Sequence, residues 1–399
     1  MSTAQPTPDK RPLLLPGIDP AAPTAVDGFW QPRRAAFWLY VMFVANGLFS
    51  IGQIIFQGYR VVPTTVVVGV LVWALYALVP LLFFRALDLY EQHPPLGFVM
   101  AFVWGGVAAT YLAIPLNAAV QSVAAKVGSA DFAQRWGPAL AGPVNEETLK
   151  LIGVIVLVMI ARSQFRGILA AVVIGATVGL GFQVVEDLVY TVNTGIEFPN
   201  TDQVAPVLLM LLVRGIFSGL FSHAMYTSIA AFGIGYYLTR PDQTRARRLL
   251  VALLAYLTAV ALHFFWNSPW LTGLSSGIGG VLLQTVIKGI PVMVVGWLIW
   301  RMAGREEGTQ LREVADYYLG DDLMTTTERE SLGSLNTRRL MRKQVRKEHG
   351  RKASRALHRL QRGQLHLIRV LEENGIGRPS VEAANEVSAL RQELTRLTT

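Results

Sequence analysis

The chain has 399 residues, of which 52% are hydrophobic and only 16% are charged, and its mean hydropathy is +0.39. This composition excludes a disordered chain, and the charged fraction lies below the roughly one quarter of soluble globular proteins. The net charge of +9 is typical of a membrane protein with excess cations on its cytoplasmic side. The lack of cysteine excludes disulfides, thiol catalysis and cysteine-ligated metals.

Apolar residues gather into long runs, each close to the length of about 20 residues that crosses a bilayer as a helix. Eight runs occur, near residues 36–56, 64–84, 97–119, 142–161, 167–192, 204–238, 249–269 and 277–301. The sixth run, with 35 residues, fits one tilted helix or two short ones. The sequence therefore predicts an all-α protein, a polytopic transmembrane helix bundle of about eight spans over residues 35–302.

The two ends of the chain are polar and are expected to lie outside the bilayer. Residues 1–34 are rich in proline and lack the apolar region and cleavage site of a signal peptide, so they predict a disordered cytosolic tail before a retained first span. Residues 303–399 contain a basic run, from Arg338 to Arg362, with Glu348 as its one acid. Apolar residues recur there at roughly helical spacing, at Leu340, Val345, Leu357, Leu360, Leu367 and Leu371. A basic cytosolic helical tail is therefore predicted.

This basic tail is expected to contact the inner membrane surface or another protein. Its cations would hold a helix with an apolar stripe at the anionic lipid of the inner leaflet. A partner helix or an acidic cytosolic protein is the alternative. Nucleic acid is the least expected partner, because acidic residues at both ends of the tail dilute its positive charge.

Lysine and arginine occur mainly in alternate connections between the runs, which predicts how the chain crosses the membrane. The cation-rich connections contain Lys10, Arg11, Arg33, Arg34, Arg85, Arg162, Arg166, Arg240, Arg245, Arg247 and Arg248. The connection after the fifth run carries Glu197 and Asp202 with no cation, although Arg60, Lys126 and Arg135 depart from the pattern. We expect a multi-pass protein of the cell membrane with both termini in the cytoplasm.

Ionisable residues inside the runs are costly, at about 2.5 to 3.5 kcal/mol each on insertion scales, and usually serve function. They are Glu146, Glu147, Lys150, Glu186, Asp187, Arg214, His223, His263 and Lys288. Glu146 and Lys150 are four residues apart and share a helix face, which allows an ion pair. The alternative is that this cluster caps the fourth helix at the outer interface, with Lys150 extending back to water. Arg214 and Lys288 are interpreted as structural counter-charges.

Carboxylates and imidazoles are expected to meet at one level of the bundle. The predicted topology puts Glu146, Glu186 and His263 in the outer half of the bilayer, with His223 deeper. His263 and Asn267 are four residues apart, so imidazole and amide project from one helix face. A carboxylate beside an imidazole can activate water, either through a bound metal or by direct general-base catalysis.

These residues form an ordered set of four short motifs on separate runs. The set reads Glu-Glu-x-x-Lys at Glu146, Glu147 and Lys150, Phe-x-x-x-Glu at Phe182 and Glu186, a later His223, and His-x-x-x-Asn at His263 and Asn267. It resembles the PrsW family of intramembrane proteases, within the wider superfamily of the type II CAAX prenyl endopeptidases, over about residues 100–302. The CAAX enzymes are the poorer match, because they carry histidine at the position of Glu186.

The resemblance implies an intramembrane endopeptidase that hydrolyses membrane-anchored protein substrates, such as an anti-sigma factor, near the outer half of the bilayer. Glu146 would activate water, with Glu147 as a second carboxylate and Lys150 holding the pair ionised. The implied ligands of a metal, zinc, are Glu186, His223 and His263. In a metal-free mechanism the same three residues would orient the water and stabilise the oxyanion together with Asn267. Which glutamate is the base stays open.

Two other function classes remain open at this point. Intramembrane carboxylates and imidazoles also relay protons or bind cations in transporters and channels. Against a transporter, no clear internal repeat is visible, and the ionisable residues concentrate in the fourth to seventh runs. The other alternative is a non-catalytic membrane scaffold that recruits partners through its basic tail, although all four motifs are intact.

Overall fold

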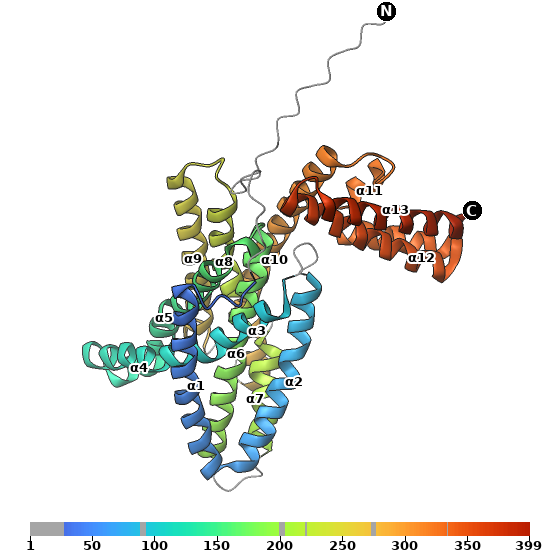
Figure 1. Cartoon of the computed structure of the whole chain (residues 1–399). Coiled ribbons are helices and arrows are strands. Elements are labelled where there is room, and N and C mark those ends of the chain that lie inside the picture. The colour runs from blue at the N-terminus through green and yellow to red at the C-terminus, as the bar shows by residue number, and fades with distance from the viewer. Residues whose placement is uncertain (1–27, 88–92, 199–203, 220–221, 273–276, 333) are drawn as a thin grey trace, which may run out of the picture.

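The computed structural model describes the chain apart from residues 1–27, 88–92, 199–203, 220–221, 273–276 and 333 (Figure 1). All regular elements in the described part are helices, which confirms the predicted all-α class. Most of the predicted N-terminal tail, including Lys10 and Arg11, lies outside the described residues, as does Asp202. The described end of that tail packs against the bundle, where the Phe29 side chain is buried.

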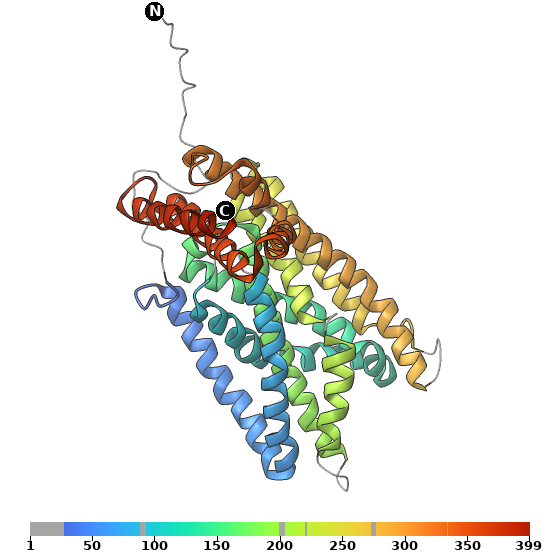
Figure 2. The ribbon, with the colours of Figure 1, turned by 90° about the vertical axis from the view of Figure 1, so that its right-hand side faces the viewer.

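The helices follow one another through short connections, as Figures 1 and 2 show. The bundle contains α1 (Ala35–Val61), α2 (Pro63–Leu87), α3 (Pro95–Val103), α4 (Thr110–Val127), α5 (Ala130–Ile160), α6 (Ile168–Glu197), α7 (Ala205–Met210), α8 (His223–Thr239), α9 (Arg245–Asn267) and α10 (Gly277–Tyr318). The tail adds α11 (Thr326–Ser331), α12 (Leu335–Asn374) and α13 (Arg378–Thr398). The described residues also include the π-helical segments η1 (Trp104–Ala109) and η3 (Leu211–Phe217) and the 3-10 turn η2 (Arg162–Gln164).

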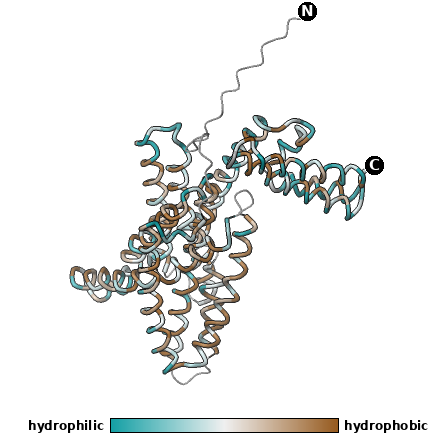
Figure 3. The backbone as a smooth tube through the Cα atoms, in the orientation of Figure 1, coloured by the Kyte–Doolittle hydropathy of each residue, from teal (hydrophilic) through white to brown (hydrophobic). Residues whose placement is uncertain are grey.

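Six helical segments of the described chain are long and apolar enough to cross a bilayer. They are Ala35–Val61, Pro63–Leu87, Pro95–Val127, Ile168–Glu197, Arg245–Asn267 and Gly279–Tyr318. These segments coincide with six of the predicted runs, and apolar residues continue along them in Figure 3. The predicted count of about eight spans is not confirmed, because the fourth and sixth runs are built differently.

The fourth predicted run is the second half of α5, which begins at Ala130, well before the apolar run. Pro138 and Pro143 lie inside this helix without ending it. Glu146 and Lys150 are consequently in the helix interior, and both are buried. The alternative in which they cap the helix at the outer interface is therefore wrong.

The sixth predicted run consists of two short helical segments, the second of the two alternatives considered for it. The first comprises α7 and η3 and ends at Phe217, and α8 begins at His223. A broken helix is tolerated at membrane depth where the freed backbone is buried in protein or lines a cavity. The break puts His223 in the first turn of α8, inside the bundle.

Helix α6 is the centre of the bundle. In its most apolar stretch 94% of the residues are buried, against 17 to 22% in α1, α2, α9 and α10, whose outer faces are exposed. Glycines let neighbouring backbones approach it closely. A Cβ at Gly105 of η1 would lie 1.8 Å from the Val178 carbonyl oxygen, and one at Gly179 would lie 2.2 Å from the His223 carbonyl oxygen. The second contact brings the backbone of α8 at His223 close to α6.

Several cation-rich connections lie at one end of the bundle (Figure 1). Arg34 Nη1 donates to a carbonyl oxygen at the end of α5 (2.8 Å), and Arg162 Nη2 donates to the Leu238 carbonyl oxygen (3.1 Å). Arg240 pairs with Glu306 of α10 at 2.9 Å. The start of α1, the ends of α5 and α8 and the start of the tail therefore share one end, which is the end that the sequence assigns to the cytoplasm.

The tail is a helical unit continuous with α10, which passes the predicted boundary at residue 302 and ends at Tyr318. Within α12, Gly350 has a φ of 84°, in the left-handed region that favours glycine, and the helix turns back there. Arg342 Nη1 donates to Gln361 Oε1 (2.6 Å) across this turn. The predicted apolar positions that are buried are Leu357, Leu360, Leu367 and Leu371. Leu340, by contrast, is exposed.

Candidate functional site

The residues predicted from the sequence converge from α5, α6, α8 and α9. They are Glu146, Glu147, Lys150, Glu186, His223, His263 and Asn267. A cavity of about 130 Å³ lies among them, and it is lined by all of these residues except Glu147 and Lys150. The structure therefore brings the predicted residues together, and it shows which side chains face the cavity and which lie behind it.

Lys150 is the buried centre of a charged cluster. Its Nζ lies 2.7 Å from Glu147 Oε1 and 3.6 Å from Glu146 Oε2. The ammonium also stands over the Phe182 ring, 4.1 Å from the ring centroid. Glu147 accepts a further hydrogen bond from Thr227 Oγ1 (3.1 Å). Each charge of the Lys150–Glu147 pair is thus compensated by the other, which a fully buried ion needs.

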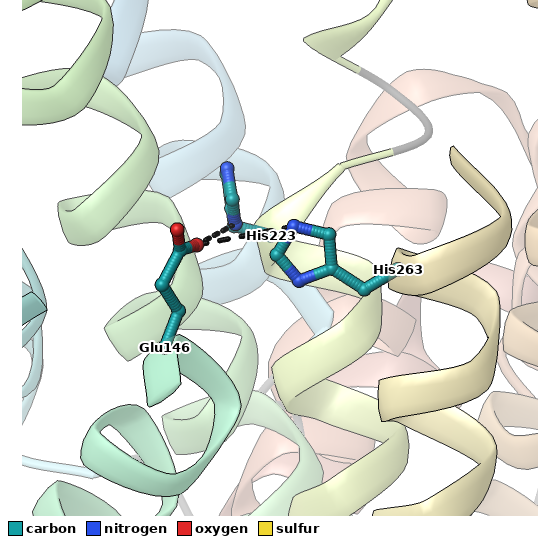
Figure 4. A group of neighbouring side chains, drawn as sticks. All are labelled: Glu146, His223 and His263. Carbon is teal, nitrogen blue, oxygen red and sulfur yellow. Dashed lines mark ion pairs between the residues drawn. The ribbon is translucent and has the colours of Figure 1, made fainter. Parts of the chain in front are cut away.

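Glu146, His223 and His263 point toward one another from α5, α8 and α9 (Figure 4). Glu146 Oε2 lies 3.7 Å from His223 Nδ1 and 3.9 Å from His263 Nε2. One candidate ligand atom of each side chain lies within 4.8 Å of the other two. Glu146 Oε2 is buried and has no hydrogen-bond partner among the described residues. A buried carboxylate oxygen without a donor is unfavourable, and a bound cation would satisfy it.

The other ring nitrogen of each histidine contacts a second carboxylate. His223 Nε2 lies 3.0 Å from Glu186 Oε2, and His263 Nδ1 lies 3.0 Å from Glu147 Oε1. Metal-ligating histidines usually carry such a carboxylate on the far side of the ring, which fixes the ring orientation. Lys150 Nζ approaches the same cluster, 2.8 Å from His223 Nδ1.

Arg214 of η3 forms ion pairs with two neighbouring acidic residues of α6, Glu186 and Asp187. Its Nη2 donates to Glu186 Oε2 (2.7 Å), and its Nε donates to Asp187. The guanidinium also stacks over the Tyr190 ring, 4.0 Å from the centroid. Arg214 therefore acts as a counter-charge, and Glu186 faces the cavity as a paired carboxylate with 19% of its side chain exposed.

A comparison with known protein families matches residues 93–299 to the PrsW family of intramembrane metalloproteases. The chain belongs to this family. No curated protein and no solved structure was found to match it. The matched region contains every residue of the cluster and leaves α1, α2 and the tail outside.

Membership of the PrsW family confirms the resemblance given by the four motifs. It supports an intramembrane peptidase that acts on membrane-embedded protein, and so favours this function over the transporter and the scaffold. The family description also indicates a metal. The cluster of Glu146, His223 and His263 has a composition that a metal accepts.

The PrsW-family site also contains residues that the sequence analysis missed. Asn117 Nδ2 of α4 donates to Glu146 Oε1 (2.9 Å), and Asn145 Nδ2 donates to Asn117 Oδ1 (3.1 Å). A Cβ at Gly142 would lie 3.0 Å from Glu146 Oε1 and 3.2 Å from Asn267 Nδ2. The one signal for Asn117 was a polar side chain inside an apolar run, and Gly142 gave no signal.

Lys288 was predicted to be a structural counter-charge, but the groups that it contacts are backbone carbonyls. Its Nζ donates to the carbonyl oxygens of Trp266 (2.9 Å) and Ser268 (2.6 Å). These carbonyls stand at the C-terminal end of α9, where a cation is favourable. They flank Asn267, whose Nδ2 donates to the Pro138 carbonyl oxygen (3.2 Å). Lys288 therefore supports the helix end that carries the His-x-x-x-Asn motif of this PrsW-family chain.

Proposed function

We propose that this chain is a metal-dependent intramembrane endopeptidase in which Glu146, His223 and His263 hold the metal ion. The observation that carries the proposal is the convergence of one carboxylate and two imidazoles within 4.8 Å from three helices. Membership of a family of intramembrane metalloproteases supports it. The proposed ligand set departs from the set implied by the sequence at one position, with Glu146 in place of Glu186.

Zinc fits this donor set, because it accepts imidazole nitrogen and carboxylate oxygen and keeps one position open in catalytic sites. Glu146 Oε2, which accepts no hydrogen bond from the described residues, and the second carboxylate on each ring support the fit. A cation at His223 Nδ1 would compete with the Lys150 ammonium, which lies 2.8 Å from that nitrogen. When bound, zinc supplies Lewis-acid polarisation of the peptide carbonyl and of the attacking water.

We assign proton transfer to Glu186. It lines the same cavity as Glu146, and its side chain is 19% exposed against 4% for Glu146, so it is the more accessible carboxylate. Arg214 keeps it in place. Glu186 would take a proton from the attacking water and pass it to the leaving amine. Glu147 lies behind the cavity against His263 and Lys150, and so serves to position the His263 ring.

Two amides are suited to the oxyanion that develops on the peptide carbonyl. Asn117 and Asn267 both line the cavity beside Glu146. Amide N–H groups directed at a developing negative charge stabilise the transition state of acyl transfer. Because that charge is absent from the bound substrate, loss of either amide is expected to lower kcat more than it raises KM.

The depth of the site supports cleavage in the half of the bilayer away from the cation-rich end. At about 1.5 Å per residue, Glu146 lies about 21 Å along α5 from Ile160, and His263 about 27 Å along α9 from Arg245. Both lengths exceed half of the roughly 30 Å hydrocarbon core. With the cation-rich end in the cytoplasm, the site belongs to the outer half, where a membrane-anchored regulator such as an anti-sigma factor is a suitable substrate.

This orientation is tested by reporter fusions after residues 200 and 245. The end of α6 at Glu197 and the start of α9 at Arg245 lie at opposite ends of the bundle, so the first fusion should report the outside and the second the cytoplasm. Two reporters on the same side would contradict the topology.

The peptidase assignment is tested by comparing protein fragments in membranes of cells that make the wild type or Glu146→Gln. N-terminal labelling should identify fragments, cut within or just outside a transmembrane segment, that occur with the wild type and are lost with Glu146→Gln. Glu313→Gln, at an exposed carboxylate of α10, is the matched control and should leave the fragments unchanged. Identical fragments in wild-type and Glu146→Gln membranes would contradict the assignment.

A further inference from the structure

A second, larger cavity is an apolar groove of about 1030 Å³ bounded by α2, α6, η3, α8 and α10. Val79 and Phe83 of α2, Leu180 of α6 and Trp297 of α10 are among the side chains that form its walls. Val79 is 73% exposed and Trp297 is 55% exposed, so the groove opens on the outer surface of the bundle. In a bilayer that surface meets hydrocarbon.

The groove has the length of one leaflet. Its wall on α2 extends from Tyr76 to Leu87, which is about 16 Å at 1.5 Å per residue. Its wall on α10 extends from Met293 to Arg305, about 18 Å. Half of the hydrocarbon core is about 15 Å, whereas a transmembrane helix needs about 30 Å. The groove therefore matches the acyl chain of a lipid better than a whole transmembrane segment.

The deep end of the groove is closed toward the catalytic cavity by a chain of hydrogen bonds. Gln183, which lines both cavities, donates from Nε2 to Tyr76 Oη (3.1 Å). Tyr76 Oη donates to the Gly215 carbonyl oxygen (3.1 Å), and Ser222 Oγ donates to Gln183 Oε1 (2.7 Å). These bonds separate the groove from the catalytic side chains, so an occupant of the groove does not enter the catalytic cavity.

The shallow end of the groove carries two cations. Arg301 and Arg305 lie four residues apart on α10, line the groove and are exposed. Among the described residues, neither pairs with a carboxylate, and Arg301 stacks over Trp297 at 4.9 Å from the ring centroid. The neighbouring Glu306 is paired with Arg240, at the cation-rich end of the bundle. The two arginines therefore stand where α10 leaves the hydrocarbon, beside a tryptophan of the kind found at membrane interfaces.

We propose that this groove binds one anionic phospholipid of the leaflet at the cation-rich end, with an acyl chain along α2 and α10 and the phosphate at Arg301 and Arg305. Basic pockets between transmembrane helices on the cytoplasmic side are known to bind anionic headgroups. A substrate helix suits the groove less well, because the cytoplasmic flanks of transmembrane segments carry lysine and arginine, which these two arginines would repel. The lipid site does not depend on the metal assignment.

Native mass spectrometry of the purified full chain tests the headgroup contact, with phosphatidylglycerol and phosphatidylcholine of equal acyl chains as probes. The wild type should bind phosphatidylglycerol more tightly. The double variant Arg301→Gln/Arg305→Gln should weaken that binding about 25-fold, from about fivefold for each cation near a membrane surface. It should weaken phosphatidylcholine binding less, because the choline cation offsets the phosphate charge that both lipids carry. The matched control Lys343→Gln/Lys347→Gln removes the same charge from the exposed surface of α12 and should bind both lipids as the wild type does.

A second pair of variants tests the acyl-chain contact. Val79→Trp narrows the groove and should weaken the binding of both lipids, whereas Leu75→Trp, at an exposed position of α2 outside the groove, should not. Equal affinity of the wild type for the two lipids would overturn the proposal. The proposal would also fail if Lys343→Gln/Lys347→Gln lost the preference for phosphatidylglycerol while Arg301→Gln/Arg305→Gln kept it. A leucine-rich single-span peptide with lysine ends is the competing probe. Its retention in place of phosphatidylglycerol, abolished by Val79→Trp, would show a substrate-helix site and refute the lipid site.

Discussion

Lys150→Met should strongly destabilise the bundle, because it leaves the Glu147 carboxylate buried without its cation. Neither side chain is exposed, and Lys150 Nζ lies 2.7 Å from Glu147 Oε1. Removing one partner of a buried ion pair costs about 3 to 5 kcal/mol. Thr227 and His263 would still contact Glu147, at 3.1 and 3.0 Å, but do not replace the lysine charge. Adding Glu147→Gln removes the uncompensated charge, so the double variant should be more stable than Lys150→Met alone.

The assay is unfolding of the purified full chain by SDS titration in mixed micelles, followed by far-UV circular dichroism. Lys126→Met, at an exposed lysine of α4, is the control and should change the unfolding free energy by less than about 0.5 kcal/mol. If the effects of Glu147→Gln and Lys150→Met simply add in the double variant, the two residues are not coupled. That result would refute the buried ion pair and its role in the site.

Three further changes test other parts of the site. Gly142→Ala should lower kcat about 100-fold with little loss of stability, because the new Cβ would displace Glu146 Oε1 and Asn267 Nδ2, which lie 3.0 and 3.2 Å from it. The kcat is measured on a substrate identified from the membrane fragments. An unchanged kcat would show that the cavity tolerates the methyl group. Lys288→Met should lower kcat about tenfold and keep the metal, since it removes hydrogen bonds at the end of α9 only; loss of metal in this variant would assign Lys288 a different role. A strong chelator should abolish cleavage and added zinc should restore it, whereas full activity in verified metal-free protein would leave only the metal-free mechanism.

The motifs named residues that lie together in the structure, but their spacing did not predict the individual contacts. The four-residue spacing of Glu146 and Lys150 allowed an ion pair between them, yet Lys150 Nζ is closer to Glu147 (2.7 Å) than to Glu146 (3.6 Å). Residues three and four apart are both neighbours on a helix, so local spacing does not choose between them. The choice depends on His263 and Thr227, which contact Glu147 from other helices.

The role proposed for Glu186 depends on a contact that the sequence did not predict. The resemblance implied that Glu186 is a metal ligand, and its Oε2 lies 3.0 Å from His223 Nε2. Arg214, which lies on a different helical segment, occupies its Oε2 atom. The start of α5 at Ala130 was also missed, because the predicted run began near residue 142. Pro138 lies inside that helix, and tertiary contacts can satisfy the backbone groups that a proline leaves without a hydrogen bond.

The metal content of purified variants tests the central claim most directly. Inductively coupled plasma mass spectrometry should find about one zinc per chain in the wild type and in Glu186→Gln. It should find far less in Glu146→Gln and His263→Gln, with SDS unfolding transitions that show both variants to be folded. Full zinc in Glu146→Gln together with loss of zinc in Glu186→Gln would contradict the assignment and restore the ligand set implied by the sequence, with Glu186 in place of Glu146.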